Sequence, residues 1–128
     1  MKVTLYLNSV CAGFPSPASD YLEGEIDLNR YLIKNPPATF IVKSQGNCML
    51  QAGIHSGDLL IVDKSIKPKN NSIVIASING DLIVKRIKIS GKKYLLTSDN
   101  KEYGKIKINN ESDIFIWGIV TKVIHNVY

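Results

Sequence analysis

Cysteine and histidine are both scarce in this chain, which has two of each among its 128 residues. Two cysteines, Cys11 and Cys48, are too few for the disulfide framework that stabilises small secreted domains. The cysteines and histidines also lack the close spacing that is typical of metal sites. From these absences we expect a protein of the reducing cytoplasm that needs no metal and no cofactor.

A long apolar run is absent as well. The chain starts with MKVTLYLNSVCAGF, in which Lys2 and a short apolar stretch imitate a secretion signal. Thr4, Tyr6 and Asn8 interrupt this stretch, which alternates as a β-strand does, and no segment approaches the roughly 20 apolar residues of a membrane-spanning helix. We therefore expect no membrane anchor, and the chain length is that of one globular domain.

The net charge is +5, from 16 lysine and arginine residues against 11 acidic ones. A basic surface can attract nucleic acid. However, no aromatic residues interleave with the lysines to form a base-stacking platform. The many lysine, isoleucine and asparagine residues indicate a compositional bias of the whole chain. We favour a solvated surface and expect no direct sequence-specific DNA binding.

Seven short runs rich in isoleucine and valine predict a mainly β fold of mostly antiparallel strands. They cover residues 38–44, 58–63, 72–78, 81–89, 93–98, 105–108 and 113–124. Asn79-Gly80 is the strongest hairpin signal, because a type I′ turn needs positive φ at both central residues. Ser90-Gly91 predicts the next turn, and Gly118 predicts a bulge or a bend. The last run is long and hydrophobic for an end strand, so we expect a second chain to cover its edge in a homodimer.

Short helices are predicted near the N-terminus. Ser16 followed by Pro17 is typical of an N-cap and a first helical position, which predicts a helix over 16–22. Asp27 can cap a second helix in LNRYLI, which Pro36 and the proline after it must end. The residues between these helices have the composition of a linker. With the turn discussed below, the fold would contain two or three short helices.

The Asn79-Gly80 hairpin places one lysine on a hydrophobic face. Alternate residues of a strand share a face, so Lys85 lies between Ile83 and Ile87. A lysine held there loses hydration, which favours its neutral form, and a neutral amine can act as a general base. From this pattern alone, the favoured alternative is an edge-strand lysine whose ammonium reaches water.

Cys48, in SQGNCML, admits two interpretations. A free cysteine is often buried and simply packs. Gly46 permits a tight turn, however, and CMLQAG is typical of one helical turn that ends at Gly53. The backbone N–H groups of Cys48 and Met49 at the start of such a turn favour negative charge and could form an oxyanion hole. From these residues alone, a Cys/Lys dyad is the less favoured interpretation.

Three segments, in this order and spacing, resemble the UmuD branch of the LexA-like self-cleaving peptidases. They are CAGFPSPASDYLEGEIDLNRYLI, GNCMLQAGIHSGDLLIVD and INGDLIVKRIKI. The resemblance runs from about Cys11 to the C-terminus. It implies a LexA-like, all-β peptidase domain over 13–128, preceded by an N-terminal arm over 1–12.

The resemblance also implies the site residues. The serine nucleophile of the family corresponds to Cys48 and its lysine base to Lys85. The bond that the family cleaves corresponds to Ala12-Gly13, so removal of the arm would be a reaction of the chain on itself.

The resemblance further implies a function. UmuD-like proteins are homodimers that cut off their own arm when prompted by RecA assembled on single-stranded DNA. The trimmed dimer then joins a translesion DNA polymerase through a UmuC-like subunit. This implies an accessory protein of the SOS response to DNA damage. LexA itself would need a helix-turn-helix domain ahead of the cleaved bond, where this sequence has twelve residues.

Three departures from the family weaken this interpretation: a short arm, a positive net charge, and sulfur in place of oxygen at Cys48. A thiol can pass its proton to an amine before attack, and an oxyanion site shaped for oxygen fits sulfur poorly, so the exchange should slow cleavage. The alternative function is a proteolytically inactive binding module that acts only as a partner of the polymerase or of RecA. A membrane-associated signal peptidase of related fold would need an anchor, which we do not find.

Overall fold

The computed structural model describes residues 1–6, 9, 23–100, 105–107 and 114–128. These residues form two compact units, Met1–Lys34 and Asn35–Tyr128. The helix predicted over 16–22 and the predicted boundary between residues 12 and 13 lie outside the described residues.

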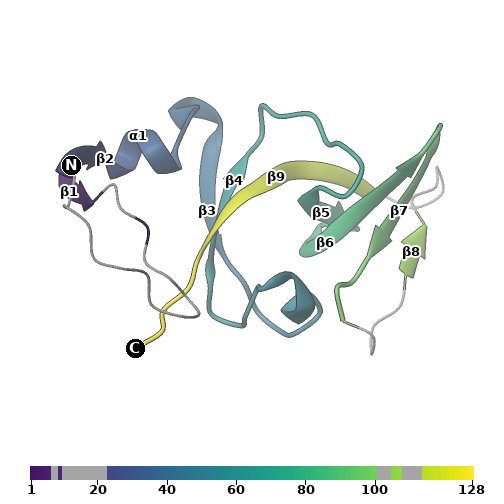
Figure 1. Cartoon of the computed structure of the whole chain (residues 1–128). Helices are drawn as coiled ribbons and strands as arrows, with labels where there is room; N and C mark the ends of the chain where they lie inside the picture. Colours follow the sequence, from purple (N-terminus) through teal and green to yellow (C-terminus); the bar gives the residue numbers. More distant parts are fainter. Residues whose placement is uncertain (7–8, 10–22, 101–104, 108–113) are drawn as a thin grey trace. The chain divides into compact units, whose positions relative to one another are not determined.

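The described residues of the first unit form two strands and one helix. Strand β1 (Lys2–Tyr6) pairs antiparallel with β2 (Glu23–Asp27), which leads directly into helix α1 (Leu28–Leu32), as Figure 1 shows. The Asp27 carboxylate accepts hydrogen bonds from the N–H groups two and three residues further on, which confirms the predicted helix cap. The sequence analysis missed β2, whose charged residues and glycine give no strand pattern; its pairing with β1 supplies the backbone hydrogen bonds.

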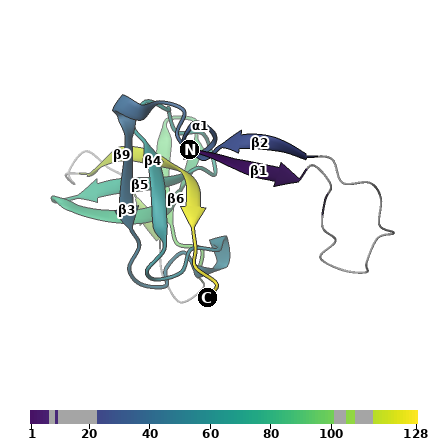
Figure 2. The same ribbon diagram turned by 90° about the vertical axis from the view of Figure 1, so that its left-hand side faces the viewer.

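The second unit is a seven-stranded sheet in the order β3-β4-β9-β5-β6-β7-β8, with every neighbouring pair antiparallel. Its elements are η1 (Pro36–Ala38), β3 (Thr39–Lys43), η2 (Leu50–Ala52), β4 (Leu59–Asp63), β5 (Ile73–Ile78), β6 (Asp81–Ser90), β7 (Lys93–Thr97), β8 (Lys105–Lys107) and β9 (Ile114–Ile124). Each of the predicted runs is a strand, so the mainly β fold is confirmed. In Figure 2, β3 and β4 run across the direction of β5 and β6, because the sheet is strongly twisted.

The predicted hairpins are present, one of them shifted. Asn79 and Gly80 both have positive φ, at 50° and 90°, as a type I′ turn requires. The next turn lies one residue later than predicted. Ser90 is still paired with Lys93, so the turn starts at Gly91, whose φ is 61°.

Gly118 marks a bulge, as predicted. The register between β5 and β9 shifts there, so that Gly118 and Ile116 face consecutive residues of β5 and Trp117 is the extra residue. A side chain at Gly118 would meet Val62, whose Cγ1 lies 2.5 Å from the position of a Cβ. The glycine is therefore needed for the close approach of β9 to β4.

The expectation that β9 has an exposed edge is wrong. β9 crosses the sheet between β4 and β5 and is paired on both sides (Figure 1), whereas β3 and β8 form the edges. The physical reason is that both faces of β9 carry core residues: Ile119 packs on one side, and Trp117 and Val120 on the other. A strand that is hydrophobic on both faces is best covered at the centre of a sheet.

The core consists of two clusters to which alternate residues of β5 contribute. One contains Met49, Ile54, Leu60, Val62 and Ile75; the other contains Val74, Ala76, Ile87, Leu96 and Ile119. Cys48 and Val84 pack against the first cluster, and Ile83 packs against the second. Strand β6, which carries Lys85, therefore contributes side chains to both clusters.

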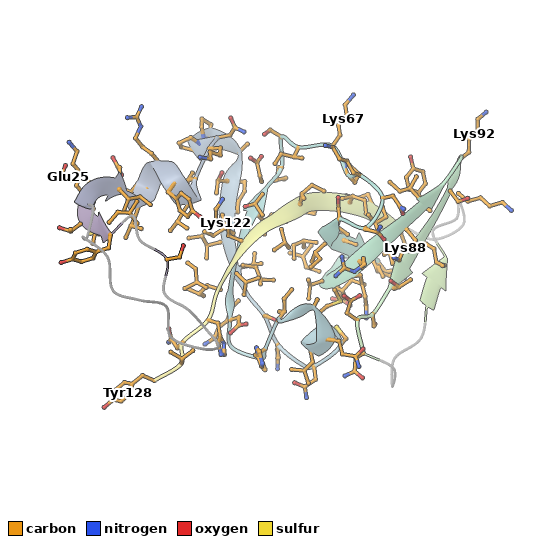
Figure 3. All side chains as sticks on the ribbon, viewed as in Figure 1. Glu25, Lys67, Lys88, Lys92, Lys122 and Tyr128 are labelled. Atoms are coloured by element: carbon orange, nitrogen blue, oxygen red, sulfur yellow. The ribbon has the colours of Figure 1, made fainter. Side chains whose placement is uncertain are left out.

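Most of the described lysines are exposed to solvent. Figure 3 shows Lys67 and Lys92 pointing away from the sheet, and both are exposed. Arg86, by contrast, is half-buried and pairs with Asp99. Within the described part of the chain, no helix is long and apolar enough to cross a membrane.

Candidate active site

Cys48 lies in a tight turn between β3 and the short helix η2. The N–H of Leu50 donates to the carbonyl of Asn47 at 3.2 Å, and η2 ends at Gly53, whose φ is 84°. The helical turn predicted in this segment is therefore present, as one 3₁₀ turn that begins just after the cysteine. Because Met49 is almost fully buried, the turn is fixed to the core beside Cys48.

The segment after β7 holds this turn from the other side. The carbonyl of Asp99 accepts a hydrogen bond from the N–H of Gln51 at 2.8 Å, and its own N–H donates to the sulfur of Met49 at 3.3 Å. The Asn100 amide donates to the carbonyl of Asn47 at 2.8 Å. The position of Cys48 thus depends on residues that follow it in sequence by about fifty positions.

Arg86 of β6 fixes that supporting segment. Its Nε donates to both carboxylate oxygens of Asp99 at 3.0 Å. These hydrogen bonds hold the pKa of Asp99 below its ordinary value and raise the pKa of Arg86, so the pair stays ionised at neutral pH. Both side chains are about one-fifth exposed, which limits screening by water.

Cys48 and Lys85 line one pocket of about 400 Å³, which we call the cysteine pocket. Both side chains are half-buried. The Cys48 thiol donates a weak hydrogen bond to the carbonyl of Val84, with an S–O distance of 3.7 Å. The structure therefore brings together the two side chains that the sequence analysis singled out separately.

Lys85 lies where β6 passes from one paired neighbour to two. Lys85 pairs with Val74 of β5, whereas the pairing of β6 with β7 begins only at Arg86, so Lys85 lies on a locally open edge of the sheet. Its Nζ donates to the hydroxyl of Ser98 at 2.6 Å. No sequence motif indicates Ser98. Only the register of the β6–β7 hairpin could have done so, because Arg86 pairs with Thr97 and Ser98 follows Thr97.

Two backbone N–H groups stand next to the thiol in the chain, those of Cys48 and Met49. Among the described residues, no acceptor is found for the N–H of Cys48 or for that of Met49. Two N–H groups without an internal acceptor can accommodate a negatively charged oxygen. Ala12 and Gly13, the predicted cleavage site, lie outside the described residues.

A second group of polar residues was missed by the sequence analysis. His55, Asp58 and His125, which we call the histidine cluster, lie together although the histidines stand far apart in sequence. No motif links them, because strand pairing between β4 and β9 alone brings them together.

Comparison with known proteins decides the family. Residues 4–121 match the Peptidase S24-like family. The chain belongs to this family. Protein ImpA of Salmonella typhimurium is 46% identical over 122 residues, which cover 94% of this chain and 82% of ImpA. Protein SamA of Salmonella typhimurium (strain LT2) is 44% identical, covering 94% of this chain and 84% of SamA.

Protein MucA of Escherichia coli is 36% identical over 121 residues, covering 94% of this chain and 82% of MucA. These relatives place this member of the Peptidase S24-like family in its UmuD-like branch, as the sequence motifs predicted.

Proposed function

We propose that this chain is a UmuD-like accessory protein of the SOS response that cleaves itself between Ala12 and Gly13. In this proposal Cys48 is the nucleophile and Lys85 is the general base. The observation that supports it best is that both side chains line one half-buried pocket, although they come from a turn and a strand that are distant in sequence.

The proposed reaction uses groups already described. The neutral Lys85 amine accepts the thiol proton, and the Cys48 sulfur attacks the carbonyl carbon of Ala12. The N–H groups of Cys48 and Met49 stabilise the oxyanion that forms. Lys85 then returns its proton to the departing amine of Gly13, which leaves an Ala12 thioester that water hydrolyses. The released products are the arm, residues 1–12, and the domain, residues 13–128.

Ser98 would support Lys85 in this reaction. Because its hydroxyl accepts one hydrogen bond from Nζ, the amine is held in one orientation and a neutral nitrogen keeps its lone pair for the thiol proton. Ser98 does not touch the reacting atoms in this scheme and is a positioning residue.

Sulfur should make the reaction slow. A thiolate–ammonium pair between Cys48 and Lys85 would already be stable before attack. This pair lowers the free energy of the ground state, so the barrier to the transition state rises. Serine cannot form such a pair, since its hydroxyl loses the proton only during attack. Restoring serine at position 48 should therefore raise the rate.

The relatives support the biological setting. A UmuD-like branch with ImpA-, SamA- and MucA-like members supports an accessory role in SOS mutagenesis, as a homodimer that associates with a DNA polymerase. We further propose that RecA filaments on single-stranded DNA prompt the cleavage and that the polymerase subunit is UmuC-like. The reaction would take place in the cytoplasm.

The test compares the intact masses of the unchanged protein, Cys48→Ser, Cys48→Ala and Lys85→Ala after incubation with RecA filaments on single-stranded DNA at raised pH. We expect Cys48→Ser to lose residues 1–12, and Cys48→Ala and Lys85→Ala to remain intact. If Cys48→Ser stays uncut under these conditions, the dyad assignment is wrong.

A second candidate function is a binding module without proteolysis. The thiol at position 48 and its hydrogen bond to the carbonyl of Val84 favour this alternative, because that bond directs the proton away from a base. A binding module predicts that the Cys48→Ala dimer supports the polymerase as well as the unchanged protein does. Loss of that support would argue for cleavage.

A further inference from the structure

Both histidines of this chain meet at one buried carboxylate. His55 lies in the loop before β4, Asp58 immediately precedes β4, and His125 immediately follows β9. Leu59 and Ile124 are paired across β4 and β9, so Asp58 and His125 are the next residues beyond that pair. The two chain segments that carry the cluster are thus held together by the sheet.

The two imidazoles face different oxygens of the same carboxylate. His125 Nδ1 lies 2.6 Å from Asp58 Oδ1, and His55 Nδ1 lies 3.8 Å from Asp58 Oδ2. The two rings stack, with centroids 4.5 Å apart and an angle of 26° between their planes. One nitrogen of each ring and one carboxylate oxygen all lie within 4.8 Å of one another.

The carboxylate is fixed and the rings are accessible. Asp58 is 3% exposed, and its Oδ2 accepts a hydrogen bond from the His55 N–H at 2.8 Å. The side chains of His55 and His125 are 48% and 41% exposed. A pocket of about 250 Å³, lined in part by Ser56 and Asn126, opens beside them and offers room for water molecules.

We propose that His55, Asp58 and His125 bind a divalent first-row transition-metal ion of the Zn²⁺ type. Two imidazole nitrogens and one carboxylate oxygen are ligands that zinc, cobalt and nickel accept, whereas magnesium and calcium prefer oxygen alone. Ligand atoms about 2.0–2.1 Å from one zinc ion are roughly 3–3.5 Å apart. The two rings would therefore rotate on binding to bring their nitrogens, now within 4.8 Å of each other and of the carboxylate oxygen, to this spacing. Water would fill the remaining coordination position.

Binding would exchange one interaction for another. The ion would take the place of the hydrogen bond between His125 Nδ1 and Asp58 Oδ1. The neutral imidazole would then carry its one proton on Nε2, which leaves the Nδ1 lone pair for the metal. The metal then links the end of β9 to the loop before β4. The loop before β4 is also hydrogen-bonded to the segment that leads from β3 to Cys48, since the N–H of Gly57 donates to the carbonyl of Ser44 at 2.8 Å. Metal binding should therefore stabilise the folded domain, by mass action.

The experiment uses untagged protein in which both thiols are removed, Cys11→Ala/Cys48→Ala, because cysteine also binds zinc. Calorimetric titration with Zn²⁺ should show one bound ion per chain and a rise in thermal midpoint. Titration with Co²⁺ should give the visible absorption of a four- or five-coordinate site formed by nitrogen and oxygen ligands. Absence of any Zn²⁺ or Co²⁺ binding at micromolar protein would overturn the proposal.

The ligands are tested by His125→Ala and His55→Ala, each made in the thiol-free protein. Loss of one ligand should weaken Zn²⁺ binding by more than the roughly 10–100-fold that is typical for loss of an outer-sphere partner. Asn126→Ala is the matched control, because Asn126 lines the same pocket and is not a ligand in the proposal. Binding that is equally tight in the histidine variants and in the control would refute the site.

Discussion

The cysteine pocket and the histidine cluster are both attached to the segment between β3 and β4, yet they are built in opposite ways. In the pocket, Cys48 and Lys85 are half-buried, and their supports come from β6 and from the segment after β7. In the cluster, the carboxylate is buried and the two rings are exposed. The pocket thus depends on supports that are distant in sequence, whereas the cluster depends on one short loop and one pair of neighbouring strands.

The largest effect that should separate the two regions comes from Lys85→Ala in the Cys48→Ser protein. We expect self-cleavage to fall about 10²–10⁴-fold, the usual contribution of a general base, while Zn²⁺ binding is unchanged. Lys88→Ala is the matched control, because Lys88 lies on the same strand and is exposed. Cleavage rates, followed by intact mass, that are equal with and without Lys85 would contradict the assignment.

A change in the shared core should affect both regions together. Gly118→Ala places a Cβ 2.5 Å from Val62 Cγ1, and such overpacking costs about 1–3 kcal/mol of the free energy of unfolding. Urea denaturation measures this loss. The control is Gly91→Asn: Gly91 has positive φ, which asparagine tolerates, and no atom lies within 4 Å of an added Cβ there. A Gly118→Ala protein as stable as the control would show that β9 can move away from β4.

Acid should loosen the cysteine pocket through Asp99. Because hydrogen bonds from Arg86 lower the folded-state pKa of Asp99, the pair stabilises the fold fully above the unfolded-state pKa. This stabilisation is lost as the pH falls through the lower, folded-state pKa. We expect Asp99→Asn to cost about 1–2 kcal/mol at neutral pH and progressively less in acid. The measurement is the urea midpoint of both proteins over this pH range, and a difference independent of pH would disprove the role of the charge.

The smallest effect should come from Ser98→Ala. Removing one hydrogen bond to Lys85 is worth about 0.5–1.5 kcal/mol, which corresponds to a fall of roughly two- to tenfold in the alkylation rate of Cys48. A positioning role also predicts a changed pH profile of alkylation, and rescue by Ser98→Thr, which keeps the hydroxyl. An unchanged profile in Ser98→Ala would show that Ser98 has no influence on Lys85.

The strands were predictable because their signals are local. Alternating or continuous runs of isoleucine and valine, with turn residues between them, define β3 to β9 without knowledge of their partners. Strand β2 was missed for the complementary reason. Its residues have no such pattern, and only the pairing with β1 makes them a strand.

The residues of the cysteine pocket and of the histidine cluster were not equally predictable from the sequence. Cys48 and Lys85 were found because each stands in a motif of the UmuD-like branch and because Lys85 interrupts a hydrophobic face. Ser98 and Asp99 lie in no motif, and their contacts follow from the register between β6 and β7. His55 and His125 stand far apart in the sequence, and their spacing does not resemble that of a metal site, so no local pattern indicates the histidine cluster.

By itself the sequence determined strands β3 to β9, two of the turns, the bulge at Gly118 and the family, because these depend on residues close together in the chain or on their order. The tertiary structure decided that β9 lies at the centre of the sheet, that Cys48 and Lys85 share a pocket, and that two distant histidines meet at Asp58. Strand order and register depend on which faces must be buried together, and that is a property of the whole chain which no local pattern contains.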